Sequence, residues 1–300
     1  MTRTTAASHT GIVPTAAPST SRMPPADLPR AWLKLSFVAA ALALGGSVVG
    51  LSVDRIYGGL TPAFLPQALA QDIANLLIAT PALVISAILA LRGSIRALMV
   101  WLGVLAFTVY NYVIYVFSIP FGALYPVWAA VLGLSLFALI GGATSLDSDA
   151  IAARFRSARA VRVAAWVTLV VAGLFVLIWL SEDVPALLTA TTPKTAVEMD
   201  LPTNPVHALD YVFFLPAAIV CGIRLLKRRA FAYPAIVALL VFMVLTCMPI
   251  LIMPFVQAVR GETAVWALLA PIGVLALVTT ASVAWLLVTV REATMPVVTV

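Results

Sequence analysis

The sequence predicts an all-α membrane protein, a polytopic bundle of about eight transmembrane helices. Of its 300 residues, 63% are hydrophobic and only 10% are charged, whereas a soluble domain is typically about half apolar and about a quarter charged. So little polar surface cannot cover a globule in water, and most of the surface must therefore face lipid. The apolar runs are continuous and approach the roughly 20 residues that a helix needs to cross hydrocarbon, which argues against a β-barrel.

The apolar runs give eight predicted spans, whose ends are accurate to a few residues. In chain order they are 31–53, 71–91, 97–117, 125–143, 163–181, 208–226, 232–254 and 265–290. Residues 1–30 are rich in Thr, Ser, Ala and Pro, and we expect them to form a disordered cytoplasmic tail. The first span is long enough to cross the membrane, so we interpret it as a retained helix and not as a signal peptide.

We expect one transmembrane domain, 31–290, followed by a cytoplasmic tail, 291–300. The connection 182–207 is polar and contains prolines. A surface loop is the simpler interpretation of this connection, and a lid over a pocket is the alternative.

Basic residues lie almost entirely on alternate connections between the predicted spans. Only three of the 18 Lys and Arg residues, Arg55, Lys194 and Arg260, belong to the other set of connections. Because Lys and Arg hold loops on the cytoplasmic side of a membrane, we expect both termini to be cytoplasmic. The formal charge of +6 reflects this anchoring, and we expect no nucleic-acid partner.

The connection 144–162 is the most basic of these loops. Ile151, Phe155, Ala158 and Val161 recur in it at helical spacing, and Ser145 or Ser148 is placed to cap a short helix. Such a segment would lie on the anionic inner leaflet. The contacts with anionic lipid are expected from Arg154, Arg156, Arg159 and Arg162. A plain topological anchor is the favoured interpretation, and lipid sensing or partner docking is the alternative.

Two segments of the chain resemble each other. Residues 81–92 are PALVISAILALR and residues 216–227 are PAAIVCGIRLLK, so Pro81 matches Pro216 and the last basic residues also match. An Asp precedes each segment, although its spacing to the proline differs. The similarity predicts two parallel halves of four helices, an arrangement that places transporter sites between the halves. Chance similarity between apolar segments is the alternative.

Polar residues gather near the outer ends of three predicted spans. Asp72 and Asn75 open the second span three residues apart, so they share a helix face. Asn111 and Tyr115 lie one turn apart on the third span, and His207 and Asp210 open the sixth. We therefore predict one outward-facing polar pocket. The alternative is that the carboxylates favour helix dipoles and that Asn111 bonds a neighbouring helix. The candidate pocket residues are Asp72, Asn75, Asn111, Tyr115, His207 and Asp210.

Carboxylates beside a histidine are suited to binding a cation or an amine, or to moving protons. They lack a third fixed ligand, so we expect no metal site. The sequence has no GxSxG, Walker, HExxH or dinucleotide-binding motif, and we assign neither a cofactor nor a catalytic residue. The two cysteines, Cys221 and Cys247, are expected to be packing residues.

Several stretches together are similar to a known group of proteins. They are QDIANL (71–76), ALRGSIRALMVWLGVLAFTVYNYVIYVF (90–117), LSLFALIGG (134–142) and NPVHALDYVFFLPA (204–217). They resemble an uncharacterised group of bacterial polytopic membrane proteins that has no assigned activity. The resemblance implies a location in the bacterial inner membrane and transfers no catalytic role.

Three classes of function remain open. A small-molecule or ion transporter is the first hypothesis, because it explains the repeat, the helix prolines and the polar pocket. An integral-membrane enzyme at the outer leaflet is the second, with His207 and Asp210 as its acid–base pair. An accessory or scaffold subunit of a membrane complex is the third, and it would explain the missing motifs. Few polar residues continue to the inner side, which is the main argument against a transporter.

Overall fold

The computed structural model describes residues 29–292 and shows an all-α bundle. Within this range, eight helical segments are long and apolar enough to cross a membrane. The predicted all-α bundle of about eight membrane helices is confirmed. The tail predicted for residues 1–30 falls almost entirely outside the described residues, as does most of the tail predicted for 291–300.

The first four spans come from residues before 145. They are α1 (Arg30–Ser52), the continuous run of α2 (Leu65–Ala74), η2 (Asn75–Ala79) and α3 (Thr80–Leu91), α4 (Ile95–Ser118) and α5 (Tyr125–Thr144). The last four are α7 (Ala158–Leu188), the run of α9 (Pro205–Leu209), η3 (Asp210–Phe214) and α10 (Leu215–Leu226), α11 (Ala232–Val259), and η4 (Trp266–Leu268) with α12 (Leu269–Thr289). Three short helices, η1 (Asp54–Ile56), α6 (Ser148–Ala152) and α8 (Lys194–Glu198), lie in connections.

Some helices extend beyond the apolar runs that predict them. The second span begins at Leu65, before the predicted start at residue 71, because Pro66 occupies a first-turn position that needs no backbone N–H donor. The fifth span, α7, covers Ala158–Leu188 instead of 163–181. The Ser157 hydroxyl caps its start by accepting a hydrogen bond from the Ala160 N–H over 3.1 Å.

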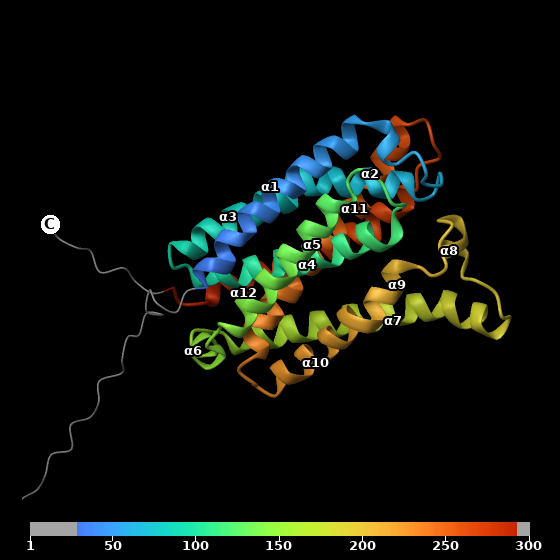
Figure 1. Ribbon diagram of the computed structural model, residues 1–300. Coiled ribbons are helices and arrows are strands. Elements are labelled where there is room, and N and C mark those ends of the chain that lie inside the picture. Colours follow the sequence, from blue (N-terminus) through green and yellow to red (C-terminus); the bar gives the residue numbers. More distant parts are fainter. Residues whose placement is uncertain (1–28, 293–300) are drawn as a thin grey trace, which may run out of the picture.

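The two ends of the bundle carry different connections. One end, here called the α8 end, has η1 and α8, and the opposite α6 end has α6 and the turns after α3 and α10 (Figure 1). Arg55, Lys194 and Arg260 belong to connections at the α8 end. The other described Lys and Arg residues belong to the α6 end, and none of them lies in the middle of a span.

The two groups of four spans pack in the same pattern. In the first, α1 and α4 each pack against both α3 and α5. In the second, α7 and α11 each pack against both α10 and α12. The groups meet where α11 packs against α4 and α2. Each helix of the first group therefore has a counterpart of equivalent packing in the second.

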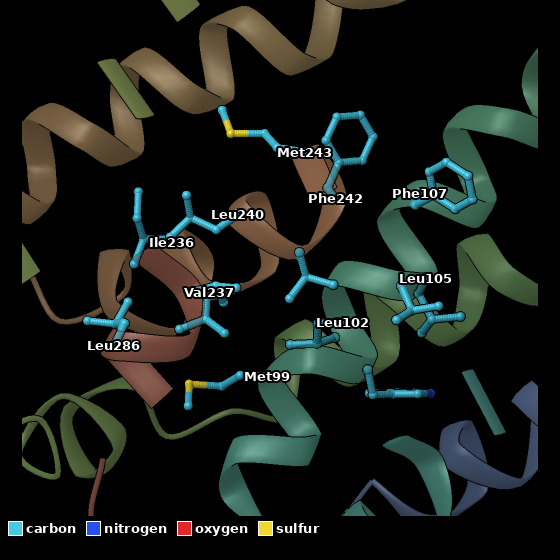
Figure 2. Packing of buried hydrophobic residues seen from close by; sticks show 14 of the residues in the cluster. Met99, Leu102, Leu105, Phe107, Ile236, Val237, Leu240, Phe242, Met243 and Leu286 are labelled. Carbon is cyan, nitrogen blue, oxygen red and sulfur yellow. The ribbon is translucent and has the colours of Figure 1, made fainter. Parts of the chain in front are cut away.

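The contact between α4 and α11 forms the centre of the hydrophobic core. Figure 2 shows Met99 and Leu102 of α4 close to Val237 of α11, and Leu105 and Leu240 belong to the same buried cluster. Gly103 permits this close approach, because a Cβ atom there would lie 2.6 Å from the Ala238 carbonyl oxygen. Large apolar side chains are also exposed on the outer faces of the spans, among them Leu77, Phe137, Leu177, Phe213 and Leu277. Lipid is the solvent that suits such a surface.

The predicted amphipathic helix in the connection 144–162 is much shorter than expected. α6 ends at Ala152, and neither predicted serine caps it, because the Asp147 carboxylate accepts a hydrogen bond from the Ala150 N–H over 2.9 Å. Ile151 is buried in the core, whereas Val161 already belongs to α7. The prediction of one surface helix through these residues was wrong, because the Ser157 cap begins a new helix.

The last described residues are fixed to the α6 end of the bundle. Phe155 and Val290 form an isolated antiparallel bridge. The Glu292 carboxylate accepts hydrogen bonds from the Ser94 hydroxyl over 2.7 Å and from the Ile95 and Arg96 N–H groups over 3.2 Å each. It thereby adds to the Ser94 cap at the N-terminus of α4, where a negative charge is favourable. Glu292, predicted to be part of a tail, is therefore a structural contact.

Candidate functional site

Two of the spans contain a π-helical turn near the α8 end. The turn η2 begins at Asn75 and η3 begins at Asp210, and each is followed by an α-helix whose second residue is proline, Pro81 or Pro216. A proline ring displaces the carbonyl of the preceding turn, and π turns occur frequently at functional sites. In this register Asn75 corresponds to Asp210 and Asp72 corresponds to His207, so the two aspartates are not equivalent positions.

Asp72 is buried and accepts hydrogen bonds from two tyrosines. The Tyr57 hydroxyl donates to one carboxylate oxygen over 2.6 Å, and the Tyr115 hydroxyl donates to the other over 2.8 Å. Only 1% of Asp72 is exposed. Tyr57 comes from the connection after α1 and Tyr115 from α4, so the carboxylate joins three parts of the first four spans. Trp128 stacks on Tyr57 and meets Tyr115 edge-on, which completes the enclosure.

The space around Asp72 is too small for additional atoms. A Cβ atom at Gly50 of α1 would overlap the Asp72 carboxylate and would lie 2.8 Å from the Tyr57 hydroxyl oxygen. Burial, and next the negative charge of Asp72, raise the pKa of Tyr57 far above its ordinary value, so this phenol remains a donor. These residues, here called the Asp72 cluster, form a closed hydrogen-bonded unit.

Asn75 and Asn111 are brought together one turn below Asp72. The Asn111 side-chain amide donates to the Asn75 side-chain oxygen over 3.1 Å, and Gln71 donates to the same oxygen over 3.1 Å. Both asparagines are 3% exposed. This contact joins α4 to η2 in the manner of interhelical amide bonds in membranes.

His207 lies in the second polar cluster and pairs with Asp183 of α7. Its Nδ1 atom is 3.0 Å and 3.1 Å from the two Asp183 carboxylate oxygens. The Tyr211 hydroxyl donates to Asp183 over 2.8 Å. His207 is 4% exposed, and its Nε2 atom has no hydrogen-bond partner among the described residues, with the nearest Glu182 carboxylate oxygen 4.0 Å away.

Asp210 is held beside this histidine by two other donors. The Tyr110 hydroxyl of α4 donates to it over 3.0 Å, and the Trp179 indole N–H of α7 donates over 2.8 Å. The Trp179 ring also packs on the His207 ring, with centroids 4.1 Å apart. The predicted His207–Asp210 pair is therefore connected through Trp179, and Asp183 is the carboxylate that bonds to the imidazole.

His207, Asp183, Tyr211, Asp210 and Trp179 are here called the His207 cluster. A cavity of about 360 Å³ adjoins this cluster at the α8 end. Its polar lining includes Asp183, His207 and Tyr211, and the chain before α9 contributes Thr203 and Asn204. Asn204 also caps α9, since its side-chain oxygen accepts a hydrogen bond from the Val206 N–H over 2.9 Å. The remaining lining is Leu180, Ala186, Leu187, Thr191, Pro193 and Ala208. The two ends of the segment 191–204 thus contribute to the wall of the cavity, in the region where the sequence allows a lid.

The six candidate residues predicted from sequence are all near the α8 end, but they belong to two clusters. Asp72 and Tyr115 bond to each other, and so do Asn75 and Asn111. His207 and Asp210 lie on the opposite side of α4, which contributes Tyr110 to Asp210. Of the six residues, the lining of the 360 Å³ cavity includes His207 alone.

Four partners of these residues were not among the predicted pocket residues: Tyr57, Tyr110, Trp179 and Asp183. Asp183 was the easiest to find, because it is an acidic residue at the end of an apolar run and intramembrane carboxylates usually have partners. The tyrosines and the tryptophan resemble interfacial aromatic residues in sequence, and only the fold shows which of them reach a carboxylate.

Within residues 29–292 no group of three or more His, Cys, Asp or Glu side chains is placed to hold a metal ion. Cys221 and Cys247 are both buried free thiols, and both belong to spans. Fold and polar clusters together define a polytopic α-helical membrane protein with a mostly apolar cavity at one end, into whose lining a few polar side chains are placed. Comparisons with protein-family models, with curated proteins and with solved structures found no match.

Proposed function

We propose that this protein is a permease-like transporter of a small cationic or amine-bearing solute, which enters through the cavity beside His207. We place it in the bacterial inner membrane with both termini in the cytoplasm. The positive-inside rule supports this orientation, since Arg55, Lys194 and Arg260 are the basic residues of the α8 end. The α8 end then faces outward and the cavity opens to the outside.

One observation carries the transporter proposal: equivalent spans of the two groups are interrupted at equivalent positions. The π turns η2 and η3 precede Pro81 and Pro216 in the same register, and polar residues accompany both. Interrupted helices in corresponding positions of two halves mark substrate sites in many transporters. The equivalent packing of the two groups of four helices supports an internal repeat as the origin of this symmetry.

The charges around the cavity favour a cation. Asp183 lines it, and Glu182 and Asp210 lie on either side of His207. Among the described lining residues none is Lys or Arg. An ammonium group would donate hydrogen bonds to Asp183, and the apolar lining would contact a short hydrocarbon body.

Transport through this fold requires a second conformation. The buried Asp and His residues in the described chain, Asp72, His207 and Asp210, are all near the α8 end. Toward the other end, buried hydroxyls such as Thr108 and Thr168 bond to carbonyls of their own helices. No fixed polar path follows from these groups, so the two groups of helices would have to move relative to each other.

The second candidate function is an integral-membrane enzyme acting at the outer leaflet. Its supporting observation is the carboxylate at His207 Nδ1 combined with an unpartnered Nε2. This arrangement orients an imidazole for proton transfer to or from a substrate. Among the described residues that line the cavity there is neither a serine nor a cysteine to act as a nucleophile, which is why transport is preferred.

Uptake into proteoliposomes tests the proposal. The probes are radiolabelled methylamine, ethanolamine and choline, with acetate as the anionic comparison. We expect protein-dependent uptake of at least one amine and an at least tenfold loss in Asp183→Asn, because one charge-assisted bond is worth about 1.5–3 kcal/mol. Glu198→Gln is the matched control, since Glu198 is a carboxylate at the same end that pairs with Lys194 and does not line the cavity.

Two outcomes would contradict the proposal. Conversion of an amine or lipid without its accumulation, abolished by His207→Gln, would favour the enzyme. Uptake that is the same in Asp183→Asn and in wild type would exclude this cavity as the entry site. If no probe is taken up or converted by wild type, by Asp183→Asn or by His207→Gln, the scaffold hypothesis gains support.

A further inference from the structure

Three arginines surround a second cavity, at the α6 end of the bundle. It has a volume of about 290 Å³ and is lined by Arg156, Arg162 and Arg228. Arg156 precedes α7, Arg162 lies in its second turn, and Arg228 belongs to the turn between α10 and α11. The remaining lining residues are Phe155, Ala158, Val161, Leu225, Leu226 and Tyr233.

No acidic side chain is among the described residues that line this cavity. Two carboxylates at the same end have other partners: Asp147 caps α6, and Glu292 bonds to Ser94 and Arg96. Three guanidinium groups thus share a concave surface without a neutralising acid in its wall. Such a grouping is a strong recognition site for a phosphate, because each guanidinium presents several fixed donors.

The start of α7 adds to the attraction for an anion. Ala158, its first residue, lines the cavity, and α7 is 31 residues long. The positive end of the helix dipole therefore points toward the cavity. The Ser157 cap occupies the Ala160 N–H, and this leaves N–H groups of the first turn available.

The other wall of the cavity is apolar and leads to the lipid-facing side of α7. The Phe155 and Tyr233 rings pack 5.1 Å apart. Beyond Arg162, Trp166, Val170 and Leu174 follow at successive helical turns and are each more than half exposed. A ligand with an anionic head and a hydrocarbon chain would contact both surfaces, whereas a free phosphate ion would use the arginines alone.

We propose that this cavity binds the phosphate of an anionic membrane phospholipid, whose acyl chains lie along α7. The proposal is independent of the solute cavity at the α8 end. It also narrows the expectation that all four arginines of the connection 144–162 bind lipid. Arg156 and Arg162 line the cavity, whereas Arg159 does not, and Arg154 donates to the Arg291 carbonyl.

Lipid retention by the full-length protein tests this proposal. Native mass spectrometry would measure binding of phosphatidylglycerol and, as the zwitterionic comparison, phosphatidylcholine to wild type and variants. We expect Arg162→Gln and Arg228→Gln each to weaken phosphatidylglycerol binding about fivefold, since one basic residue near an anionic leaflet is worth about 1 kcal/mol. Arg159→Gln removes an equal charge from the same helix end and is expected to leave binding unchanged.

The remaining outcomes overturn the proposal. An equal loss in Arg159→Gln would show that general surface charge holds the lipid. Equal binding of the two phospholipids would remove the role of the anionic head. If inorganic phosphate at millimolar concentration displaces phosphatidylglycerol fully, the site takes a free phosphate. If Arg162→Gln does not fold, Arg228→Gln alone tests the proposal. Arg228 is an exposed residue of a turn, so its substitution should not disturb folding.

Discussion

The spans Leu65–Leu91 and Pro205–Leu226 use the same backbone arrangement for different purposes. Both contain a π turn followed by a proline in the same register. Around the first, the carboxylate of Asp72 is enclosed and bonded to two tyrosines. Around the second, His207 keeps an unpartnered nitrogen and lines a cavity. The comparison shows that a π turn positions polar groups, while their neighbours decide whether a ligand can reach them.

The difference comes from what covers each turn. Residues 53–64 place Tyr57 directly over Asp72, and α1 passes so closely that only glycine fits at position 50. The longer connection after α7 covers His207 less completely. Its Thr195 is held by Glu182 over 2.8 Å, so this connection stands at the side of the cavity and forms a wall.

The largest expected effect is loss of stability on changing Asp72 to Ala. Two tyrosine hydroxyls would lose their acceptor and a void would form, so the free energy of unfolding should fall by about 3 kcal/mol. Unfolding in mixed detergent micelles measures this change. His207→Ala, at the equivalent position, should lose less than about 1 kcal/mol, because Asp183 keeps Tyr211 as a donor. Similar losses of unfolding free energy in the two variants would refute the distinction between the closed Asp72 cluster and the His207 cluster, which adjoins a cavity.

The next effect concerns the tight approach of α1 to the Asp72 cluster. Gly50→Ala should lower the free energy of unfolding by about 1–3 kcal/mol, because the new Cβ atom overlaps the carboxylate and forces it to move. Gly45→Ala is the matched control in the same helix, since a Cβ there meets no atom within 4 Å. The control should be neutral or slightly stabilising. A tolerated alanine at position 50 would mean that the enclosure around Asp72 is loose.

The smallest effect on stability is expected from Tyr211→Phe in the His207 cluster. Asp183 would lose one donor but keep His207, so stability should change by less than about 1 kcal/mol. Binding of the transported amine should nevertheless change by a few fold, because Tyr211 lines the cavity. Calorimetric titration with the amine found by uptake measures this. A large loss of stability without a change in binding would assign Tyr211 a structural role.

Much of the fold was predictable because apolar length is read directly from the sequence. The eight spans follow from runs near 20 residues. The gathering of Asp72, Asn75, Asn111 and Tyr115 at one end also followed from helix spacing.

The rest depended on contacts between distant segments. The acidic residues 182–183 looked like the end of a span, since carboxylates disfavour hydrocarbon. They remain within α7 because Asp183 bonds to His207 and Tyr211, and Glu182 bonds to Thr195. The π turns were equally hidden, because no local composition distinguishes them from α-helix and only the register of the backbone bonds reveals them.

The contact between Glu292 and α4 can form only late in the assembly of the bundle. Glu292 adds to the cap at the start of α4, and it lies 198 residues beyond Ser94 in the chain. During synthesis α4 therefore enters the membrane with only the Ser94 hydroxyl as its N-terminal cap, and the Glu292 contacts arrive only after α12 has been inserted. A chain stopped within α12 would therefore contain all of the earlier helices and would still lack the Glu292 contacts with α4.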